Sequence, residues 1–325
     1  MSRFILTCVL ALATGSAVLA QPAADANWPD RPIRLVVPLP AGSAVDVIAR
    51  LIVQRLGVRL GQPVVIENRA GASGILGADA VAKAAPDGYT LGMATSTTHM
   101  TAPVLNAKLP YDPVKDFAPV AIVGASPYVL VINPKVPAKT VGELIALAKA
   151  KPKTLSYSSV GNASQAHLAG ELFAAMAGVE LNHIPYKTST HAVIDLNEGR
   201  IDMQFGILGS SLALIREGKL TALAVSTARR LDELPEVPTM IEAGLPDYDV
   251  SLLFAVVAPA GTSRPIVTRL NREIGDIVGA PEVKRVLALQ AIQAASSTPE
   301  QLHERIAKEI ELWRGIAKKA GMQPE

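Results

Sequence analysis

A strand, a loop and a helix follow one another most clearly in the stretch Leu35-Val36-Val37-Pro38-Leu39-Pro40-Ala41-Gly42-Ser43-Ala44-Val45-Asp46-Val47-Ile48-Ala49-Arg50. An apolar, β-branched run ends at a loop of Pro, Gly and Ser, and an amphipathic helical pattern begins directly after it. We call this strand–loop–helix segment the first junction. Backbone N–H groups and the positive end of the helix dipole converge at such a helix start, so the segment suits an anion. A plain capped turn, with Ser43 as the cap and Asp46 as its capping-box partner, fits the same residues.

The rest of the chain repeats this alternation of short apolar runs and helical patterns. Strands are expected at residues 33–38, 64–67, 90–95, 129–133, 155–159, 181–186, 201–205, 220–226 and 253–259. Helices are expected at residues 45–60, 75–85, 141–150, 165–177, 191–198, 211–216, 265–278, 282–289 and 299–320. Such alternation with short connections predicts an α/β fold of mostly parallel sheets flanked by helices. The strands at 129–133 and 253–259 are the candidates for crossings between two domains.

The amino terminus and the composition indicate where the protein works and which partners it lacks. The apolar run from Phe4 to Ala20 predicts a secretory signal peptide over residues 1–20, with cleavage expected after Ala20. A membrane anchor is the weaker alternative, because the run is at the short limit for a span. The only cysteine, Cys8, would leave with it. The 31 basic and 29 acidic residues form no basic cluster, and aromatic residues make up 4% of the chain, which argues against a nucleic-acid partner.

Three further loops follow strands or precede helices. The second junction runs from the strand at 155–159 through Val160-Gly161-Asn162-Ala163-Ser164 into the helix at 165–177. Hydroxyls gather in Thr95-Ser96-Thr97-Thr98-His99, and Gly71-Ala72-Ser73-Gly74-Ile75-Leu76-Gly77 is a glycine-rich loop of close approach. Open α/β sheets bind ligands at the carboxyl ends of their strands. Each loop taken alone also fits ordinary capping.

Enzyme and metal motifs are missing from the sequence. There is no Gly-x-Ser-x-Gly elbow, phosphate-binding loop or dinucleotide fingerprint, and no nucleophile–base–orienter set can be assembled. His99, His167, His183 and His191 lack metal-ligand spacing, so we expect local hydrogen bonds, no metal and no cofactor. Lys187 is either a surface lysine or a residue facing a cleft.

Several segments, taken in order along the chain, resemble the Bug/TctC family of extracytoplasmic solute-binding proteins of tripartite tricarboxylate transporters. Besides the first junction, they are Trp28-Pro29-Asp30-Arg31-Pro32-Ile33, Val65-Ile66-Glu67-Asn68-Arg69-Ala70-Gly71-Ala72, Pro86-Asp87-Gly88-Tyr89-Thr90-Leu91, residues 158–167, Pro185-Tyr186-Lys187, Leu234-Pro235-Glu236-Val237-Pro238-Thr239 and Ala258-Pro259-Ala260-Gly261-Thr262. The resemblance covers essentially the whole chain after the signal peptide.

The resemblance implies a two-lobed type II periplasmic-binding-protein fold, of the Venus flytrap kind, and no catalysis. Lobe 1 would comprise residues 21–126 and 252–325, and lobe 2 residues 127–251. A monomer in the periplasm would bind a small organic carboxylate between the lobes and deliver it to the permease subunits of a tripartite tricarboxylate transporter. The expected ligand-binding residues are Pro40, Ala41, Gly42, Ser43, Asp46, Ser73, Ser96, Thr97, His99, Ser158, Gly161, Asn162, Ala163, Ser164, Lys187, Thr188 and Gly206.

The chain departs from the family pattern at three of these positions. The family usually has glycine where Ser43 and Thr188 stand, and often an acidic residue near Gly206. The added hydroxyls and the missing charge disfavour an amino acid and favour a mono- or dicarboxylate, including aromatic acids. Two alternatives stay open: a sensory partner that presents the bound acid to a membrane receptor, and an exported α/β enzyme.

Overall fold

The computed structural model describes residues 27–162, 164–319, 321, 322 and 324. The expected signal peptide, residues 1–20, and Ala163 of the second junction lie outside the described residues. Within them, no helix is long and apolar enough to cross a membrane.

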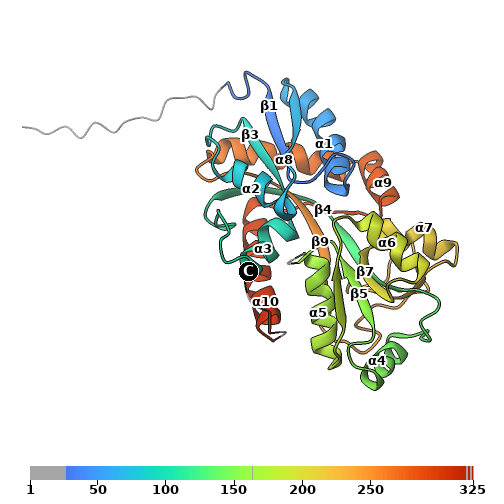
Figure 1. The fold of residues 1–325 in the computed structure, drawn as a ribbon. Coiled ribbons are helices and arrows are strands. Elements are labelled where there is room, and N and C mark those ends of the chain that lie inside the picture. The colour runs from blue at the N-terminus through green and yellow to red at the C-terminus, as the bar shows by residue number, and fades with distance from the viewer. Residues whose placement is uncertain (1–26, 163, 320, 323, 325) are drawn as a thin grey trace, which may run out of the picture.

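One continuous sheet organises the molecule (Figure 1). Its strands lie in the order β2 (Val64–Asn68), β1 (Ile33–Val37), β3 (Thr90–Thr95), β9 (Ser251–Pro259), β4 (Phe117–Ile132), β7 (Met203–Ile207), β5 (Ser156–Ser159) and β6 (Asn182–Pro185), with β8 (Thr221–Val225) and β10 (Gln293–Ala294) also paired to β4. Strands β1, β2 and β3 are parallel to one another, as are β5, β6 and β7. The long strands β4 and β9 are antiparallel and join these two groups.

The pairing directions make the two parallel groups face each other. Because β9 is antiparallel to both β3 and β4, the strands β3 and β4 run in the same direction. Strand β7 is antiparallel to β4, so the β5–β7 group runs the opposite way. Thr95, at the end of β3, pairs with Phe254, which pairs with Gly124 of β4, whereas Ile207, at the end of β7, pairs with Tyr128. The carboxyl ends of both groups therefore meet around residues 124–128 of β4.

Helices cover both faces of each group. They are α1 (Ala44–Leu60), α2 (Ile75–Ala82), α3 (Ala102–Leu105), α4 (Val141–Ala150), α5 (Gln165–Ala177), α6 (Ser189–Glu198), α7 (Leu208–Arg216), α8 (Arg264–Gly279), α9 (Pro281–Leu289) and α10 (Pro299–Lys319), with the short turns η1 (Ala72–Gly74) and η2 (Thr97–Thr101). Alternating residues of β1 show why: Ile33, Leu35 and Val37 pack with α1 and α8, while Val36 joins the cluster on the opposite face with Ala78 of α2.

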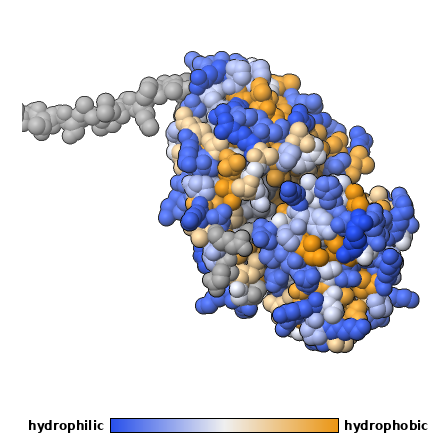
Figure 2. Space-filling view, viewed as in Figure 1, coloured by the Kyte–Doolittle hydropathy of each residue, from blue (hydrophilic) through white to orange (hydrophobic). Residues whose placement is uncertain are grey.

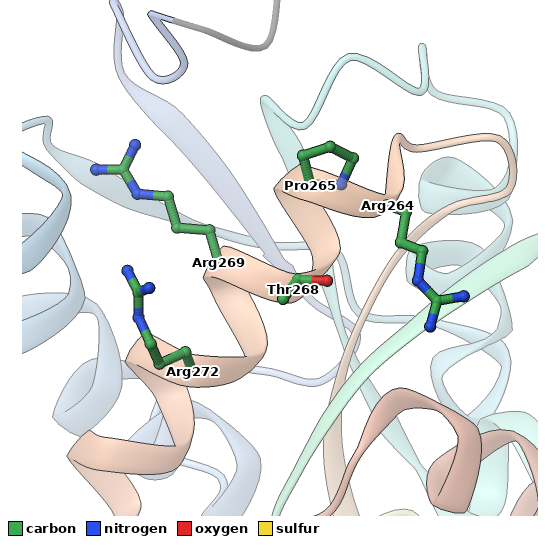
Figure 3. A pocket seen from close by; sticks show the side chains of 5 residues that line it. All are labelled: Arg264, Pro265, Thr268, Arg269 and Arg272. Carbon is green, nitrogen blue, oxygen red and sulfur yellow. The ribbon is translucent and has the colours of Figure 1, made fainter.

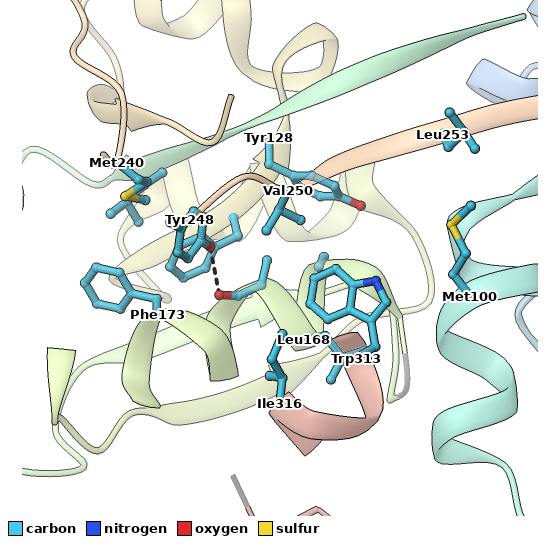
Figure 4. Packing of buried hydrophobic residues seen from close by; sticks show 14 of the residues in the cluster. Met100, Tyr128, Leu168, Phe173, Met240, Tyr248, Val250, Leu253, Trp313 and Ile316 are labelled. Carbon is cyan, nitrogen blue, oxygen red and sulfur yellow. Dashed lines mark hydrogen bonds between the residues drawn. The ribbon is translucent and has the colours of Figure 1, made fainter. Parts of the chain in front are cut away.

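One hydrophobic core is shared by both groups of strands. It contains Val36 and Met100 from the first group, Tyr157 and Phe173 from the second, and Trp313 of α10. In Figure 4, Trp313 and Ile316 of α10 lie beside Leu168 of α5, and the Tyr248 hydroxyl donates a 2.8 Å hydrogen bond to the Ala169 carbonyl. On the other face, the cores under α1 and α8 and under α7 are separate clusters.

The α/β architecture and most of the expected elements are confirmed. Strand β7, expected at 201–205, lies at Met203–Ile207, and the short strand β10 was not expected. Four further differences concern β4, η2, α2 and α7. Strand β4 begins at Phe117, whereas only 129–133 were expected, because Pro119, Gly124 and Pro127 interrupt its apolar pattern. The expected hydroxyl loop at 95–99 continues as a π-helical turn, η2, into α3. Helix α2 ends at Ala82, three residues early. Helix α7 starts at Leu208, directly after β7.

Candidate functional site

The first junction has the conformation of a capped helix start. Gly42 adopts a φ of +82°, a left-handed conformation that favours glycine, and a Cβ at this position would meet no atom within 4 Å. Ser43 is the N-cap of α1, and its hydroxyl accepts a 3.4 Å hydrogen bond from the Asp46 amide. The amides of Ala44 and Val45 belong to the first helical turn and therefore have no acceptor inside the helix. These amides point out of the helix start, where an anion is favoured.

Asp46 holds this loop from inside rather than facing outward. Its side chain is buried, and its carboxylate accepts hydrogen bonds from the Gly42 amide at 2.9 Å and the Asn68 side chain at 2.9 Å. Arg50 donates to both carboxylate oxygens, at 2.9 and 3.2 Å. Burial opposes ionisation, but the hydrogen bonds from Arg50, Gly42 and Asn68 outweigh it and keep the pKa of Asp46 below its usual value. Asp46 is thus a positioning residue for the loop.

The second junction repeats the cap geometry with different supports. Ser164 caps α5 with φ and ψ of −69° and 154°, against −69° and 159° at Ser43. Gly161 has a φ of +111°, and its carbonyl accepts hydrogen bonds from the hydroxyls of Ser159 (2.9 Å) and Ser164 (2.7 Å). The Gly161 amide donates to Ser159 Oγ at 3.2 Å. The neutral hydroxyls of Ser159 and Ser164 therefore hold this loop, whereas the Asp46 carboxylate holds the loop of the first junction.

Two stacked histidines stand beside the second junction. The rings of His167 and His183 lie 3.7 Å apart and are nearly parallel, and His183 Nε2 lies 2.7 Å from Ser159 Oγ. Burial lowers the pKa of His167 to about 4, and burial together with the neighbouring His167 lowers the pKa of His183 to about 4. Both rings are therefore neutral at physiological pH and add no positive charge beside the second junction.

The glycine-rich segment brings α2 against the first junction. A Cβ on Gly77 would lie 2.7 Å from Pro38 Cα, so only glycine permits this contact. Ala72 and Ser73 have left-handed φ angles of 47° and 54°, a conformation that costs free energy and is common at functional sites. The exposed Ser73 faces the second junction, since its Oγ lies 3.9 Å from the position a Gly161 Cβ would occupy. The glycine-rich loop of close approach is confirmed in this respect.

The hydroxyl segment after β3 is tied to the crossing strand. Ser96 is fully buried, accepts a 2.9 Å hydrogen bond from the Leu253 amide and donates to the Ser251 carbonyl. His99 lies in the core with its ring 4.5 Å from that of Phe117, and burial lowers its pKa to about 3. Thr97 is half-buried at the start of η2. Ser96 and His99 therefore position this segment.

The remaining expected residues divide between exposed and buried positions. Pro40, Ala41, Asn162, Lys187 and Thr188 are exposed, and Thr188 also caps α6 by accepting a hydrogen bond from the His191 amide. Ser158 and Gly206 are buried on neighbouring strands β5 and β7.

Three polar residues that the sequence analysis did not single out lie near these positions. Gln165 Nε2 donates to the Ser251 carbonyl at 2.9 Å, the same acceptor that Ser96 uses, so α5 and η2 meet at the start of β9. Gln204 and Ser211 are 3% and 0% exposed, and Gln204 Oε1 and Ser211 Oγ have no hydrogen-bond partner. Gln204 could have been noticed in the sequence, because it is the one polar side chain in the apolar segment Met203–Ile207.

A separate hollow lies on the surface of α8. A hollow of about 450 Å³ on α8 is lined by Arg264, Pro265, Thr268, Arg269 and Arg272 (Figure 3). Its arginines already have partners: Arg264 pairs with Glu300, Arg269 donates to the Trp28 carbonyl and Arg272 pairs with Glu273. On the face shown in Figure 2, hydrophilic residues predominate and apolar residues form small separate groups.

The fold and the facing junctions define the class of α/β periplasmic binding proteins. Residues 48–322 match the model of the TctC family, described as the tripartite tricarboxylate transporter family receptor. The chain belongs to this family, which is one of binding proteins and not of enzymes.

Similar proteins agree with this assignment. Protein BugT of Bordetella pertussis is 40% identical, and the match covers 97% of each chain. The solved structure of R. palustris Rpa4515 with adipate is 37% identical, with a TM-score of 0.84 over 92% of this chain and 100% of the other. MatC from Rhodopseudomonas palustris with bound malate is 32% identical, with a TM-score of 0.78 over 89% of this chain and 99% of the other.

Proposed function

We propose that this protein binds a small organic carboxylate in the periplasm, between two lobes, and delivers it to the membrane permease of a tripartite tricarboxylate transporter. The observation that carries the proposal is the pair of capped helix starts, α1 and α5, at carboxyl strand ends that face each other in a TctC-family chain. Relatives with bound adipate and malate support a carboxylate as the ligand class.

The proposed lobes are residues 21–126 with 252–325, and residues 127–251. Strands β4 and β9 span both boundaries, which supports a role as the hinge. Helix α10 belongs to lobe 1 by sequence but packs against α5 of lobe 2. The free energy with which a ligand shifts the two lobes toward the closed form equals the difference between its affinities for the closed and the open form.

The ligand carboxylate is proposed to meet the first-turn amides of α1 and α5, with Gly42 and Gly161 allowing close backbone approach. Asp46, Ser96, His99 and the capping serines hold the loops in place. Ser73, Thr97, Asn162, Lys187 and Thr188 border the space between the lobes. Water molecules that bridge the amides and the carboxylate would let one site accept different acids.

A thermal-shift screen with mono-, di- and tricarboxylates and aromatic acids tests the proposal. An acid present at a hundred times its Kd stabilises the native state by about 2.7 kcal/mol, which raises the melting temperature by several degrees. The proposal fails if sugars or amines shift the transition and no carboxylate does. Loss of uptake of the same acid after gene deletion tests transport, whereas loss of a signalling response alone would favour the sensory alternative.

A further inference from the structure

A four-residue loop at the start of the glycine-rich segment, residues 71–74, packs on two of the segments around the proposed ligand site. A Cβ at Gly74 would lie 3.2 Å from Pro38 Cβ in the first junction and 2.7 Å from Thr98 Cγ2 in the hydroxyl segment. Gly74 is buried, so the end of the loop lies directly against both segments.

The tip of the same loop lies close to the second junction. Ser73 Oγ is 3.9 Å from the position that a Cβ on Gly161 would occupy. Because Gly161 has no side chain, Ser73 can approach the backbone of the second junction. Ala72 and Ser73 are exposed, so this approach is not part of the protein core. Through its tip and its end, the loop reaches all three segments around the proposed ligand site.

The backbone of the loop has an unusual conformation. Four successive residues have positive φ angles, namely 137°, 47°, 54° and 95° at Gly71, Ala72, Ser73 and Gly74. Glycine adopts such angles without steric cost, whereas the Cβ atoms of Ala72 and Ser73 make them unfavourable. A strained backbone persists only where its surroundings hold it. Loss of the contacts at the tip would therefore let the loop relax into another conformation.

The loop is fixed at its two ends and not in its middle. The Arg69 amide donates a 2.8 Å hydrogen bond to the last residue of β1, and a Cβ on Gly77 would clash with the first junction. The 2.9 Å hydrogen bond from the Gly74 amide to the Gly71 carbonyl stays within the loop. In the part of the chain that the structure describes, the Ser73 hydroxyl has no hydrogen-bond partner. The ends can therefore act as hinges for the middle.

The shared core makes movement of the loop cheaper than separation of the proposed lobes. Trp313 of α10 is 1% exposed and packs with Met100 of η2 and Leu168 of α5, which lie in different proposed lobes (Figure 4). Pulling the lobes apart at this point would expose apolar surface to water, which is unfavourable in proportion to its area. Residues 71–74 are not members of this core, so their movement leaves it intact.

We infer that residues 71–74 form a lid that lifts to admit the carboxylate and closes over it, with Ser73 meeting the second junction at Gly161. This inference rests on the proposed function and adds the route by which the ligand enters and leaves. The Ser73 hydroxyl, at the tip of the lid, can donate a hydrogen bond to the carboxylate of a bound acid. A closed lid also keeps water away from the site and slows release of the ligand.

A pair of cysteines tests whether the lid controls exchange of the ligand. The chain from Gln21 onward contains no cysteine, so the double variant Ser73→Cys/Gly161→Cys has only the two introduced thiols. Bridged Cβ atoms lie about 3.5–4.5 Å apart, a distance that the contact described above reaches after a small movement of the loop. Ser73→Cys/Asn162→Cys is the second pair, because cysteine at Gly161 would strain its φ of +111°.

Labelled adipate is the probe, and the acid with the largest thermal shift replaces it if adipate produces none. An acid bound before oxidation should leave the bridged protein at least about 10-fold more slowly than the reduced protein, and an acid added after oxidation should bind at least about 10-fold more slowly. A reductant should restore both rates. The single variant Ser73→Cys is the matched control, and oxidation should change neither of its rates.

Two further measurements separate a lid from a movement of whole lobes. Hydrogen exchange of the amides in residues 72–74 should slow at least about 10-fold when the acid is bound, because the closed lid opens less often. The variant Trp28→Phe leaves Trp313 as the only tryptophan, at the contact between the proposed lobes. Its emission maximum and its quenching by acrylamide should be the same with and without the acid.

Four outcomes overturn these claims in distinguishable ways. If neither cysteine pair forms a bridge while an acid is bound, the lid does not close at the second junction. If a bridged protein exchanges the acid as fast as the Ser73→Cys control, the loop does not control access. A shift of Trp313 emission without a change in exchange at residues 72–74 would mean that whole lobes move and the lid does not. In each of these cases the proposed function stands, whereas it fails if the reduced protein binds no acid.

Discussion

The two junctions share one backbone design and differ in what stabilises it. Each has a left-handed glycine, a capping serine with nearly the same φ and ψ, and a helix that begins at a carboxyl strand end. The first loop is held by the buried, ionised Asp46, and the second by neutral hydroxyls beside two stacked histidines. The same helix start can therefore be stabilised by charge or without it, and the two loops should respond differently to mutation and to acid.

The largest expected effect is on ligand binding at the first junction. Gly42→Val puts a β-branched side chain into the loop and strains a left-handed φ, so carboxylate affinity should fall about 100-fold or more, equal to about 2.7 kcal/mol. Gly61→Val is the matched control, since Gly61 has a φ of +73° and open space at the other end of α1. Calorimetric titration should show lost affinity only for Gly42→Val. Equal affinities in the two variants would remove the first junction from the site.

The second prediction is that the stability of the two junctions depends differently on pH. A pKa of about 4 for His167 and His183, below the usual 6.5, means that the unfolded state binds more protons between these values. The contribution of each neutral histidine to the free energy of unfolding is therefore fully present above pH 6.5. It is lost as the pH drops toward 4, by at most about 3 kcal/mol for one such histidine. The lowered pKa of Asp46 acts later, because its contribution is lost only as the pH falls below the unfolded value of 3.8.

Denaturant unfolding at pH 7.5 and 4.5 measures this difference. The double variant His167→Gln/His183→Gln should lose less stability than the natural chain between these two pH values. His303→Gln, at an exposed position on α10, serves as the control and should behave like the natural chain. A double variant with the unaltered pH dependence would show that the stacked pair does not titrate as described.

Removal of the Asp46 carboxylate should lower the free energy of unfolding by less than acidification does, but by a measurable amount. Asp46→Ala leaves the Gly42 amide and the Asn68 side chain without their acceptor, so the free energy of unfolding should fall by about 1–3 kcal/mol. Arg50→Ala should cost less than about 1 kcal/mol, because the Arg50 side chain is 55% exposed. An Arg50→Ala loss as large as that of Asp46→Ala would show that the ion pair, and not the loop hydrogen bonds, carries the stability.

The smallest effect tests what the junctions have in common. Ser43→Ala and Ser164→Ala each remove a capping hydroxyl of the same geometry, so each should lower the free energy of unfolding by about 1 kcal/mol. Ser164→Ala also removes a hydrogen bond to the Gly161 carbonyl, which would make it the larger of the two. Chemical denaturation at neutral pH compares them. A larger loss at Ser43 would contradict the shared design.

Most of the fold could be predicted from the sequence because its elements depend on local patterns. The helix starts at Ser43 and Ser164 follow from capping chemistry, and the long carboxyl-terminal helices follow from their periodicity. Strand β4 could not be predicted over its full length, since Pro119 and Pro127 within it are stabilised by pairing with β9, a strand more than a hundred residues away. For the same reason the segment 95–99 was expected to be a loop, whereas Thr97–Thr101 forms the π-helical turn η2.

The loops that expose backbone amides could be found in the sequence, because glycine, serine and the following helical pattern act within a few residues. Which side chains support those loops depends on tertiary contacts. Asn68 reaches Asp46 across 22 positions, and His167 stacks on His183 from a different element. Such contacts depend on register and packing, which local residue patterns do not specify.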